Sequence, residues 1–162
     1  MERMFAPWRL EVIETYKSTA SCILCNILKM EDDEEALILE RAEESFVLMN
    51  KFPYSNGHLM FVPNRHVKEW SELTAQELEE MMRLSQKAVK VLRDCFQCEA
   101  FNLGANLGAA AGAGIPDHLH LHLVPRWSGD TNFMPVLAEV KVLPEHLKQS
   151  YKKLKKAWGL VS

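Results

Sequence analysis

Several common signatures are missing from this sequence. No apolar run approaches the roughly 20 residues that cross a bilayer, and the N-terminus has no signal-peptide pattern. Basic charge is not in excess, because the net charge is −3, so nothing points to nucleic acid. Internal repeats, linkers and low-complexity stretches are absent as well. We therefore expect a cytoplasmic protein that has neither a membrane nor a nucleic acid as its partner.

Cysteine is scarce and falls into two CxxC pairs. Cys22 and Cys25 form the first pair, and Cys95 and Cys98 form the second. In a reducing compartment such cysteines are free thiols or metal ligands rather than disulfides.

The sequence does contain enough apolar residues for a folded domain. Its 162 residues are 48% hydrophobic and 25% charged, which suits one domain over residues 1–162 with a proper core. Strand-like segments, a helix, further strands and a last helix follow one another with short connections between strands. That order favours an α+β fold with an antiparallel sheet. We expect strands at 36–41, 45–50, 58–62 and 100–106, and one more at the histidine segment described below.

Both expected helices have start signals. Thr74 and Glu77 form a capping-box pattern, which predicts a helix that runs to about Asp94. Pro144 suits the first position of a second helix, whose apolar stripe should pack on the body of the protein. That stripe consists of Leu147, Tyr151, Leu154 and Trp158. The remaining segments are expected to be an N-terminal arm at 1–20, a solvated acidic turn at 31–35 and an irregular stretch at 125–143.

An alternating histidine segment is the most distinctive feature. In a strand, side chains alternate between the two faces, so His118, His120 and His122 would share one face at a spacing of roughly 6.6 Å. The leucines between them would face the core. The preceding loop, 106–114, is rich in glycine and alanine, which lets backbone amides approach an anion. A three-histidine zinc site and a purely structural role are the alternatives.

The chain resembles the histidine triad (HIT) superfamily of nucleotide hydrolases and transferases. The likeness is carried by Leu48-Met-Asn50, Pro53-Tyr54, the segment 57–63, Asn106-x-Gly-x-x-x-Gly112 and the histidine segment. It covers a motif core at about 22–126, followed by a C-terminal extension at 127–162. The tail at 125–133 is similar to a bacterial and archaeal branch that includes diadenosine tetraphosphate phosphorylases. The resemblance implies a five-stranded antiparallel sheet with two main helices, and a homodimer with a ten-stranded sheet.

The same resemblance implies roles for individual residues. His120 would attack the α-phosphorus and form a nucleotidyl-histidine intermediate, and His122 would contact the phosphate and the bridging oxygen. His58 would be a supporting histidine, and the alternative is a satisfied core histidine. Asn50 would contact the sugar of the nucleotide, and the alternative is a simple turn residue. The catalytic set would be His58, His118, His120 and His122; the nucleotide-binding set adds Asn50, Asn106, Gly112, Ala113, Gly114 and Ile115 to His122.

One departure concerns the phosphate-facing loop. Many family members have a hydroxyl and an amide side chain shortly before the triad, whereas this chain has Gly112-Ala-Gly-Ile-Pro-Asp117, one residue longer and without the hydroxyl. Backbone N–H groups would therefore make the phosphate contacts. An ordinary tight turn is the alternative for this loop.

The resemblance also completes a metal site. Cys22 and Cys25 need two more ligands for a closed tetrahedral zinc site, and the family implies His66 and His118. We expect structural Zn²⁺ there and no organic cofactor. The alternatives are two buried thiols, or a four-cysteine site that includes the second CxxC pair, which we expect instead to act as small buried apolar residues.

The expected activity is cleavage of a dinucleoside polyphosphate or nucleotide conjugate at the α-phosphate. Water or inorganic phosphate could be the acceptor, and a nucleotide-binding regulatory module with little turnover is the alternative. Arg126 and Asn132 follow the histidine segment and could favour phosphate, although Arg126 could equally form a surface ion pair.

Overall fold

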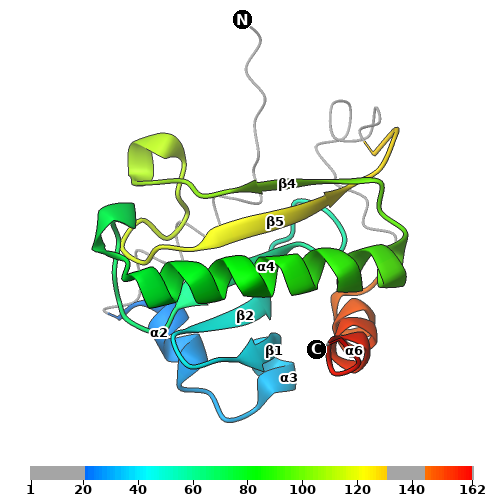
Figure 1. The fold of residues 1–162 in the computed structure, drawn as a ribbon, viewed down its shortest axis with the longest axis horizontal. Coiled ribbons are helices and arrows are strands. Elements are labelled where there is room, and N and C mark those ends of the chain that lie inside the picture. Colours follow the sequence, from blue (N-terminus) through cyan, green and yellow to red (C-terminus); the bar gives the residue numbers. More distant parts are fainter. Residues whose placement is uncertain (1–20, 131–144, 162) are drawn as a thin grey trace, which may run out of the picture.

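The protein is described here by a computed structural model, which covers residues 21–130 and 145–161. Expectations that concern 1–20, Asn132 and Pro144 lie outside the described residues. Five antiparallel strands form one sheet in the order β1-β2-β3-β5-β4 (Figure 1). The expected α+β fold with a five-stranded antiparallel sheet is thus confirmed. The strands are β1 (Ile38–Arg41), β2 (Ser45–Met49), β3 (Leu59–Pro63), β4 (Ala100–Gly104) and β5 (Leu121–Arg126).

Helices lie around this sheet. The long helix α4 crosses one face of the sheet, and the C-terminal helix α6 lies beside it (Figure 1). Among the described residues, no helix is both long and apolar enough to cross a membrane. The helices are α2 (Ile23–Leu28), α3 (Asp33–Ala36), α4 (Ala75–Phe96) and α6 (Leu147–Trp158), with single 3-10 turns η1 (Trp70–Glu72) and η2 (Ala109–Ala111).

Strand β2 is buried on both of its faces, so it divides the core in two. Because successive side chains point to opposite faces, Val47 and Met49 join the larger cluster with α4 and α6. Phe46 and Leu48 join a smaller cluster on the other face, where Leu24 of α2 packs. The expected stripe of α6 does pack on the body, since Tyr151, Leu154 and Trp158 are all buried in the larger cluster.

Helix α4 begins where the sequence predicts. The Thr74 side chain accepts a hydrogen bond from the Glu77 backbone N–H, and Glu77 in return accepts one from the Thr74 N–H. The helix continues to Phe96, slightly beyond the expected end, and Gln97 then adopts a left-handed conformation with φ of 51°.

The sequence predicts a solvated turn for the acidic run 31–35, but the structure has a short helix there. The Asp32 side chain accepts hydrogen bonds from two backbone N–H groups and thereby caps α3. Asp33 in α3 forms ion pairs with Arg41 and Lys155. Helix α3 therefore occupies the first part of the predicted strand 36–41, and β1 begins only at Ile38.

The histidine segment also differs from the expectation of one continuous strand. β5 begins at Leu121, so His118 and His120 lie before the strand rather than within it. The Leu119 backbone N–H donates to the carbonyl of Val67 at 2.7 Å, which directs this stretch away from the regular ladder. Likewise α6 begins at Leu147, with the His146 side chain as its cap.

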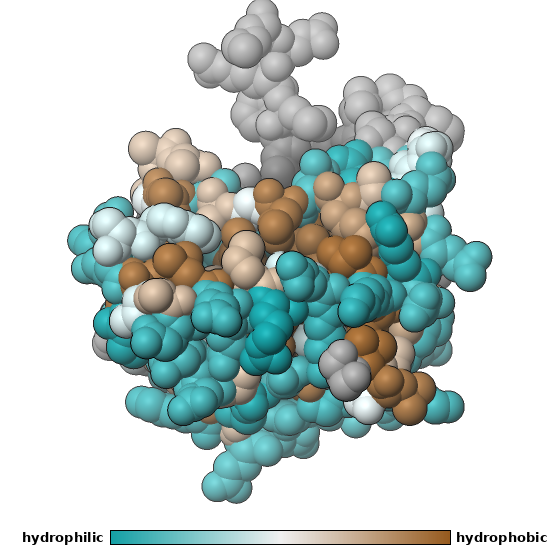
Figure 2. All heavy atoms as spheres, viewed as in Figure 1, coloured by the Kyte–Doolittle hydropathy of each residue, from teal (hydrophilic) through white to brown (hydrophobic). Residues whose placement is uncertain are grey.

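One edge strand of the sheet is covered by a helix, and the other is exposed. At the β1 edge, α6 donates hydrogen bonds to the Ile38 carbonyl from both Tyr151 and Lys155. At the β4 edge, Leu103 stays 49% exposed, and apolar side chains gather on the surface where β4 runs alongside α4 (Figure 2). An exposed edge of this kind is suited to pairing with another strand.

Candidate nucleotidyl-transfer site and metal centre

The three histidines of the triad do not share one face: His118 faces the cysteines, whereas His120 and His122 lie together beside a cavity. The imidazole of His118 is fully buried and turns toward Cys22 and Cys25. His120 is 5% exposed, and His122 lines an open cavity. The rings of His120 and His122 remain close, with centroids 4.7 Å apart and planes at 83°.

The candidate metal ligands predicted from the sequence do come together. One ligand atom from each of Cys22, Cys25, His66 and His118 lies within 4.8 Å of the other three. The Nδ1 atom of His118 is 3.3 Å from the Cys22 sulfur and 3.5 Å from the Cys25 sulfur, and His66 Nδ1 is 3.3 Å from the Cys25 sulfur. A zinc tetrahedron built from usual Zn–S and Zn–N lengths has edges of about 3.3–3.8 Å. The spacing therefore fits Zn²⁺ with two thiolates and two imidazoles.

Hydrogen bonding gives His118 the tautomer that a metal ligand needs. Its Nε2 lies 3.0 Å from the carbonyl oxygen of Pro63, and a carbonyl can only accept, so Nε2 carries the proton. Nδ1 is then a free lone pair that faces the two thiols. Burial also lowers the pKa of His118, which favours the neutral imidazole.

The second cysteine pair takes no part in this centre. In the described part of the chain, the cluster with metal-ligating geometry contains neither Cys95 nor Cys98. Cys98 is buried and Cys95 half-buried, and burial raises the pKa of both thiols. The two thiols lie at the end of α4, and that of Cys95 donates to the Lys153 carbonyl at 3.9 Å.

His120 has the tautomer of a nucleophile. Its Nδ1 is 2.8 Å from the backbone carbonyl of His118, so Nδ1 must donate and Nε2 keeps its lone pair. Burial lowers the pKa of His120, and the backbone hydrogen bond opposes this only in part. A neutral imidazole with a bare Nε2 can attack an electrophilic phosphorus. The same His118 whose ring faces the metal centre therefore orients His120 through its carbonyl.

A second chain of hydrogen bonds fixes the proton of His122. The backbone N–H of Tyr54 donates to His58 Nδ1 at 3.1 Å, so the proton of neutral His58 is on Nε2. That Nε2 lies 2.9 Å from His122 Nδ1, which must then accept, and the proton of His122 is left on Nε2. The fully buried His58 is thus a partner of the triad and not an isolated core histidine.

Asn50 lies beside this relay but also shapes its own loop. Its Nδ2 is 3.4 Å from His58 Nδ1, while its Oδ1 accepts from the Phe52 backbone N–H at 2.9 Å. The second contact is the turn role that the sequence left open as an alternative.

The cavity next to His122 has a volume of about 410 Å³. Strand alternation places Asn102, Gly104 and His122 on its wall, and Asn106 closes one end. Of the predicted nucleotide-binding loop, Asn106 lines the cavity, and Gly112 to Ile115 do not. The sequence had not singled out Ser55, Asn102 or Asp130; the two-residue step from Asn106 to Gly104 and Asn102 was the signal available for Asn102.

Arg126 at the far end of the cavity is already paired. Its guanidinium donates to both carboxylate oxygens of Asp130, at 2.6 and 2.8 Å, and to Asn102 Oδ1 at 2.8 Å. Its charge is therefore compensated within the protein, which matches the ion-pair alternative and not a free cation ready for phosphate.

These features define a class of protein. A five-stranded antiparallel sheet carries two close histidine rings beside a cavity, and one of the two histidines is buried with its Nδ1 held by a backbone carbonyl. The chain belongs to the HIT family: the HIT domain matches residues 31–129.

Several relatives support this assignment. The chain is 41% identical over 127 residues to a Mycobacterium tuberculosis protein named AP-4-A phosphorylase, an alignment that covers 78% of this chain and 65% of that relative. It is 31% identical over 93 residues to the asymmetrical bis(5'-nucleosyl)-tetraphosphatase of Schizosaccharomyces pombe, covering 57% of this chain and 50% of that enzyme. The alignments thus span about two thirds or less of these relatives' own length.

Solved structures share the fold. A zinc-bound histidine triad family protein from Mycobacterium smegmatis superimposes with a TM-score of 0.69 at 21% identity, over 86% of this chain and 94% of that one. A histidine triad nucleotide-binding protein from Sulfolobus tokodaii gives 0.65 at 25% identity, over 85% and 89%.

Proposed function

We propose that this protein cleaves dinucleoside polyphosphates, with diadenosine tetraphosphate as the type substrate, at an α-phosphorus. The observation that carries the proposal is the buried His120, whose Nδ1 is held by the His118 carbonyl at 2.8 Å so that Nε2 is a free nucleophile. The similarity to AP-4-A phosphorylase points to the same class of substrate.

In the first step, the lone pair of His120 Nε2 forms a bond to the α-phosphorus and the bond to the bridging oxygen breaks. His122 carries its proton on Nε2 and gives that proton to the departing oxygen. The leaving nucleotide departs through the cavity that His122 lines. Asn106, which lines this cavity, and the backbone amides of Gly114 and Ile115 hold the phosphate oxygens. The N–H groups of Gly112 and Ala113 already donate to the carbonyls of Ala109 and Gly108.

In the second step, an acceptor oxygen attacks the phosphorus and His120 leaves. Phosphate as acceptor gives ADP, and water gives AMP. The 41% identity to a phosphorylase favours phosphate. Because Arg126 is already bound to Asp130, we assign phosphate recognition to Asn106 and the amides of Gly114 and Ile115 rather than to Arg126.

We further propose that Cys22, Cys25, His66 and His118 hold structural Zn²⁺. Their donor set and spacing fit it, as described above, and a zinc-bound protein has the same fold. When bound, the ion would supply a fixed cross-link between α2 and the segments that follow β3 and precede β5. We also propose a homodimer, formed across the exposed β4 edge and α4.

Product analysis tests the activity. The protein is incubated with diadenosine tetraphosphate in phosphate buffer and in phosphate-free buffer. ADP and ATP formed only with phosphate establish phosphorolysis, whereas AMP and ATP at equal rates in both buffers establish hydrolysis. Tight AMP binding without cleavage in either buffer would instead favour a regulatory nucleotide-binding module.

A further inference from the structure

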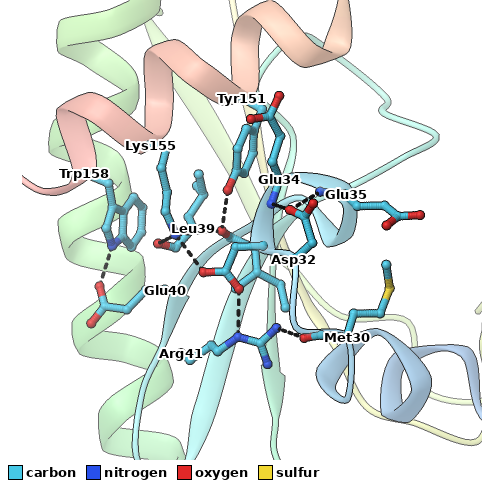
Figure 3. Close-up of polar contacts among 12 residues, drawn as sticks. Met30, Asp32, Glu34, Glu35, Leu39, Glu40, Arg41, Tyr151, Lys155 and Trp158 are labelled. Atoms are coloured by element: carbon cyan, nitrogen blue, oxygen red, sulfur yellow. Dashed lines mark hydrogen bonds and ion pairs between the residues drawn. The ribbon is translucent and has the colours of Figure 1, made fainter.

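The C-terminal helix α6 is anchored to the sheet along its length. Tyr151 donates from its hydroxyl to the Ile38 carbonyl at 3.0 Å, and Lys155 reaches Asp33 and the same carbonyl, both at 3.0 Å (Figure 3). Trp158 donates to Glu40 further along. These contacts involve β1 and α3.

The first turn of α6 makes a different connection. Ser150 is fully buried, and its hydroxyl lies 2.7 Å from Glu145 Oε2 and 2.9 Å from Asn56 Oδ1. Asn56 is itself only 8% exposed. It belongs to the loop between β2 and β3, at a separation of 94 residues from Ser150. The hydroxyl has one proton and can donate to only one of these oxygens at a time. Hydrogen bonds from Ser150 and also from the Asn56 side chain lower the pKa of Glu145, so Ser150, Glu145 and Asn56 form one network that links the C-terminal extension to that loop.

That loop is the one that orients His58. Asn56 lies midway between Tyr54, whose N–H donates to His58 Nδ1, and His58 itself. The loop is closed by a hydrogen bond from the His58 N–H to the Ser55 carbonyl at 3.2 Å. Because the contact between Tyr54 and His58 spans only four residues, a shift of Asn56 changes the position of both groups.

We propose that Ser150 and Asn56 are positioning residues for proton transfer. By holding the loop, they keep the Tyr54 N–H on His58 Nδ1, which places the His58 proton toward His122 and leaves the His122 proton on Nε2. The inference depends on the proposed function, since it assigns Ser150 a role in the first step of that reaction. It gives the extension after residue 126 a part in catalysis.

Leaving-group dependence distinguishes this role from a merely structural one. When the bond between phosphorus and the leaving oxygen breaks, a weakly basic oxygen can depart as an anion, whereas a more basic one needs the proton from His122. p-Nitrophenolate is weakly basic, and phenolate resembles the tyrosine side chain with a pKa of about 10. A fault in the proton relay should therefore slow the phenyl ester of AMP more than the p-nitrophenyl ester.

The experiment compares the wild type, Ser150→Ala and Tyr151→Phe on the two esters and on diadenosine tetraphosphate. Tyr151→Phe is the matched control, because it removes a neighbouring hydroxyl of α6 while Ile38 keeps its bond to Lys155. General acid catalysis contributes about 10²–10⁴-fold, so we expect Ser150→Ala to lose at least about 10-fold more kcat/KM, which reports the first step, on the phenyl ester than on the p-nitrophenyl ester. Tyr151→Phe should leave that ratio unchanged.

Three results would overturn the inference: equal losses on both esters, the same ratio change in Tyr151→Phe, or no loss at all in Ser150→Ala. If Ser150→Ala does not fold, as judged by thermal melting, Asn56→Ala tests the other side of the same contact and should shift the ratio in the same direction. If the wild type cleaves none of the three substrates, the proposed function itself fails, which is a separate outcome.

Discussion

Substitution of Gly57 by alanine tests how tightly the loop before His58 is held. Gly57 has φ of +74°, and an added Cβ would lie 2.9 Å from Leu92 Cδ2 and 2.9 Å from Phe96 Cε2. The left-handed conformation costs an alanine about 1–2 kcal/mol, and displacement of two packed side chains costs about 1–3 kcal/mol. The lower chain entropy of the unfolded variant offsets about 0.4–1 kcal/mol. We expect a net loss of about 3 kcal/mol.

Gly129→Ala is the control that separates the two costs. Gly129 has φ of +76°, close to that of Gly57, but no atom in the described part of the chain lies within 4 Å of an added Cβ. Its expected loss is therefore only the backbone term, about 1 kcal/mol. The difference of about 2 kcal/mol between the variants measures the contact of the loop with α4.

Thermal unfolding followed by circular dichroism or calorimetry provides the assay. For a chain of this size, 1 kcal/mol shifts the Tm by about 2–4 °C, so Gly57→Ala should lower the Tm by about 6–12 °C and Gly129→Ala by about 2–4 °C. If both variants melt within about 1 °C of each other, Leu92 and Phe96 yield freely and α4 does not hold the loop.

Four further predictions follow from the site and the fold. His120→Ala should abolish turnover while AMP binding, measured by calorimetry, survives; turnover at a similar rate would rule out the covalent intermediate. Purified protein should contain equimolar zinc by elemental analysis, and Cys25→Ser should lose both the zinc and several degrees of Tm. If the wild type melted at the same Tm with and without zinc, the metal centre would be contradicted. Light scattering should give a dimer at micromolar concentration and a monomer for Leu103→Glu, and a monomeric wild type would refute the dimer. Burial alone would raise the pKa of Asp33, but hydrogen bonds and charge from Arg41 and Lys155 lower it below its usual value of 3.8. The ionised carboxylate therefore stabilises the fold fully above pH 3.8, and this stability is lost as the pH falls through the lowered pKa of the folded protein. In thermal melts at acid pH, Lys155→Ala should lose less stability than the wild type as the pH falls, and an identical pH dependence would count against this pairing.

Much of the architecture could be predicted from local sequence patterns. The capping box at Thr74 and Glu77 marked the start of α4, because its two hydrogen bonds join residues three apart. Short continuous apolar runs marked β2 and β3, and both strands are buried along their whole length. The prediction was wrong where local patterns compete. The acidic run could form either a turn or a helix, and the Asp32 cap together with the Asp33 ion pairs stabilises helix α3.

The candidate site was partly predictable in the same way. The sequence identified His120 as the central histidine and Cys22 and Cys25 as a metal pair, and the resemblance added His58 and His66. The resemblance also assigned His118 to the metal pair, but the expected continuous strand with three rings on one face was wrong, because β5 begins only at Leu121. A regular strand would put all three rings on one face, but the Leu119 hydrogen bond to Val67 interrupts the ladder, and His118 can then turn toward the thiols.

The sequence by itself determined which side chains are available and how they are spaced along each segment. Only the tertiary structure decided which of them meet. The Cys22 and His118 pair joins positions 96 residues apart, Ser150 and Asn56 are separated by 94, and His58 and His122 by 64. Helix and strand periodicities relate residues only two to four apart, so they carry no information about such pairs. The tautomers of His118 and His122 follow from contacts with Pro63 and His58, which are 55 and 64 residues away, whereas that of His120 follows from the His118 carbonyl two residues away.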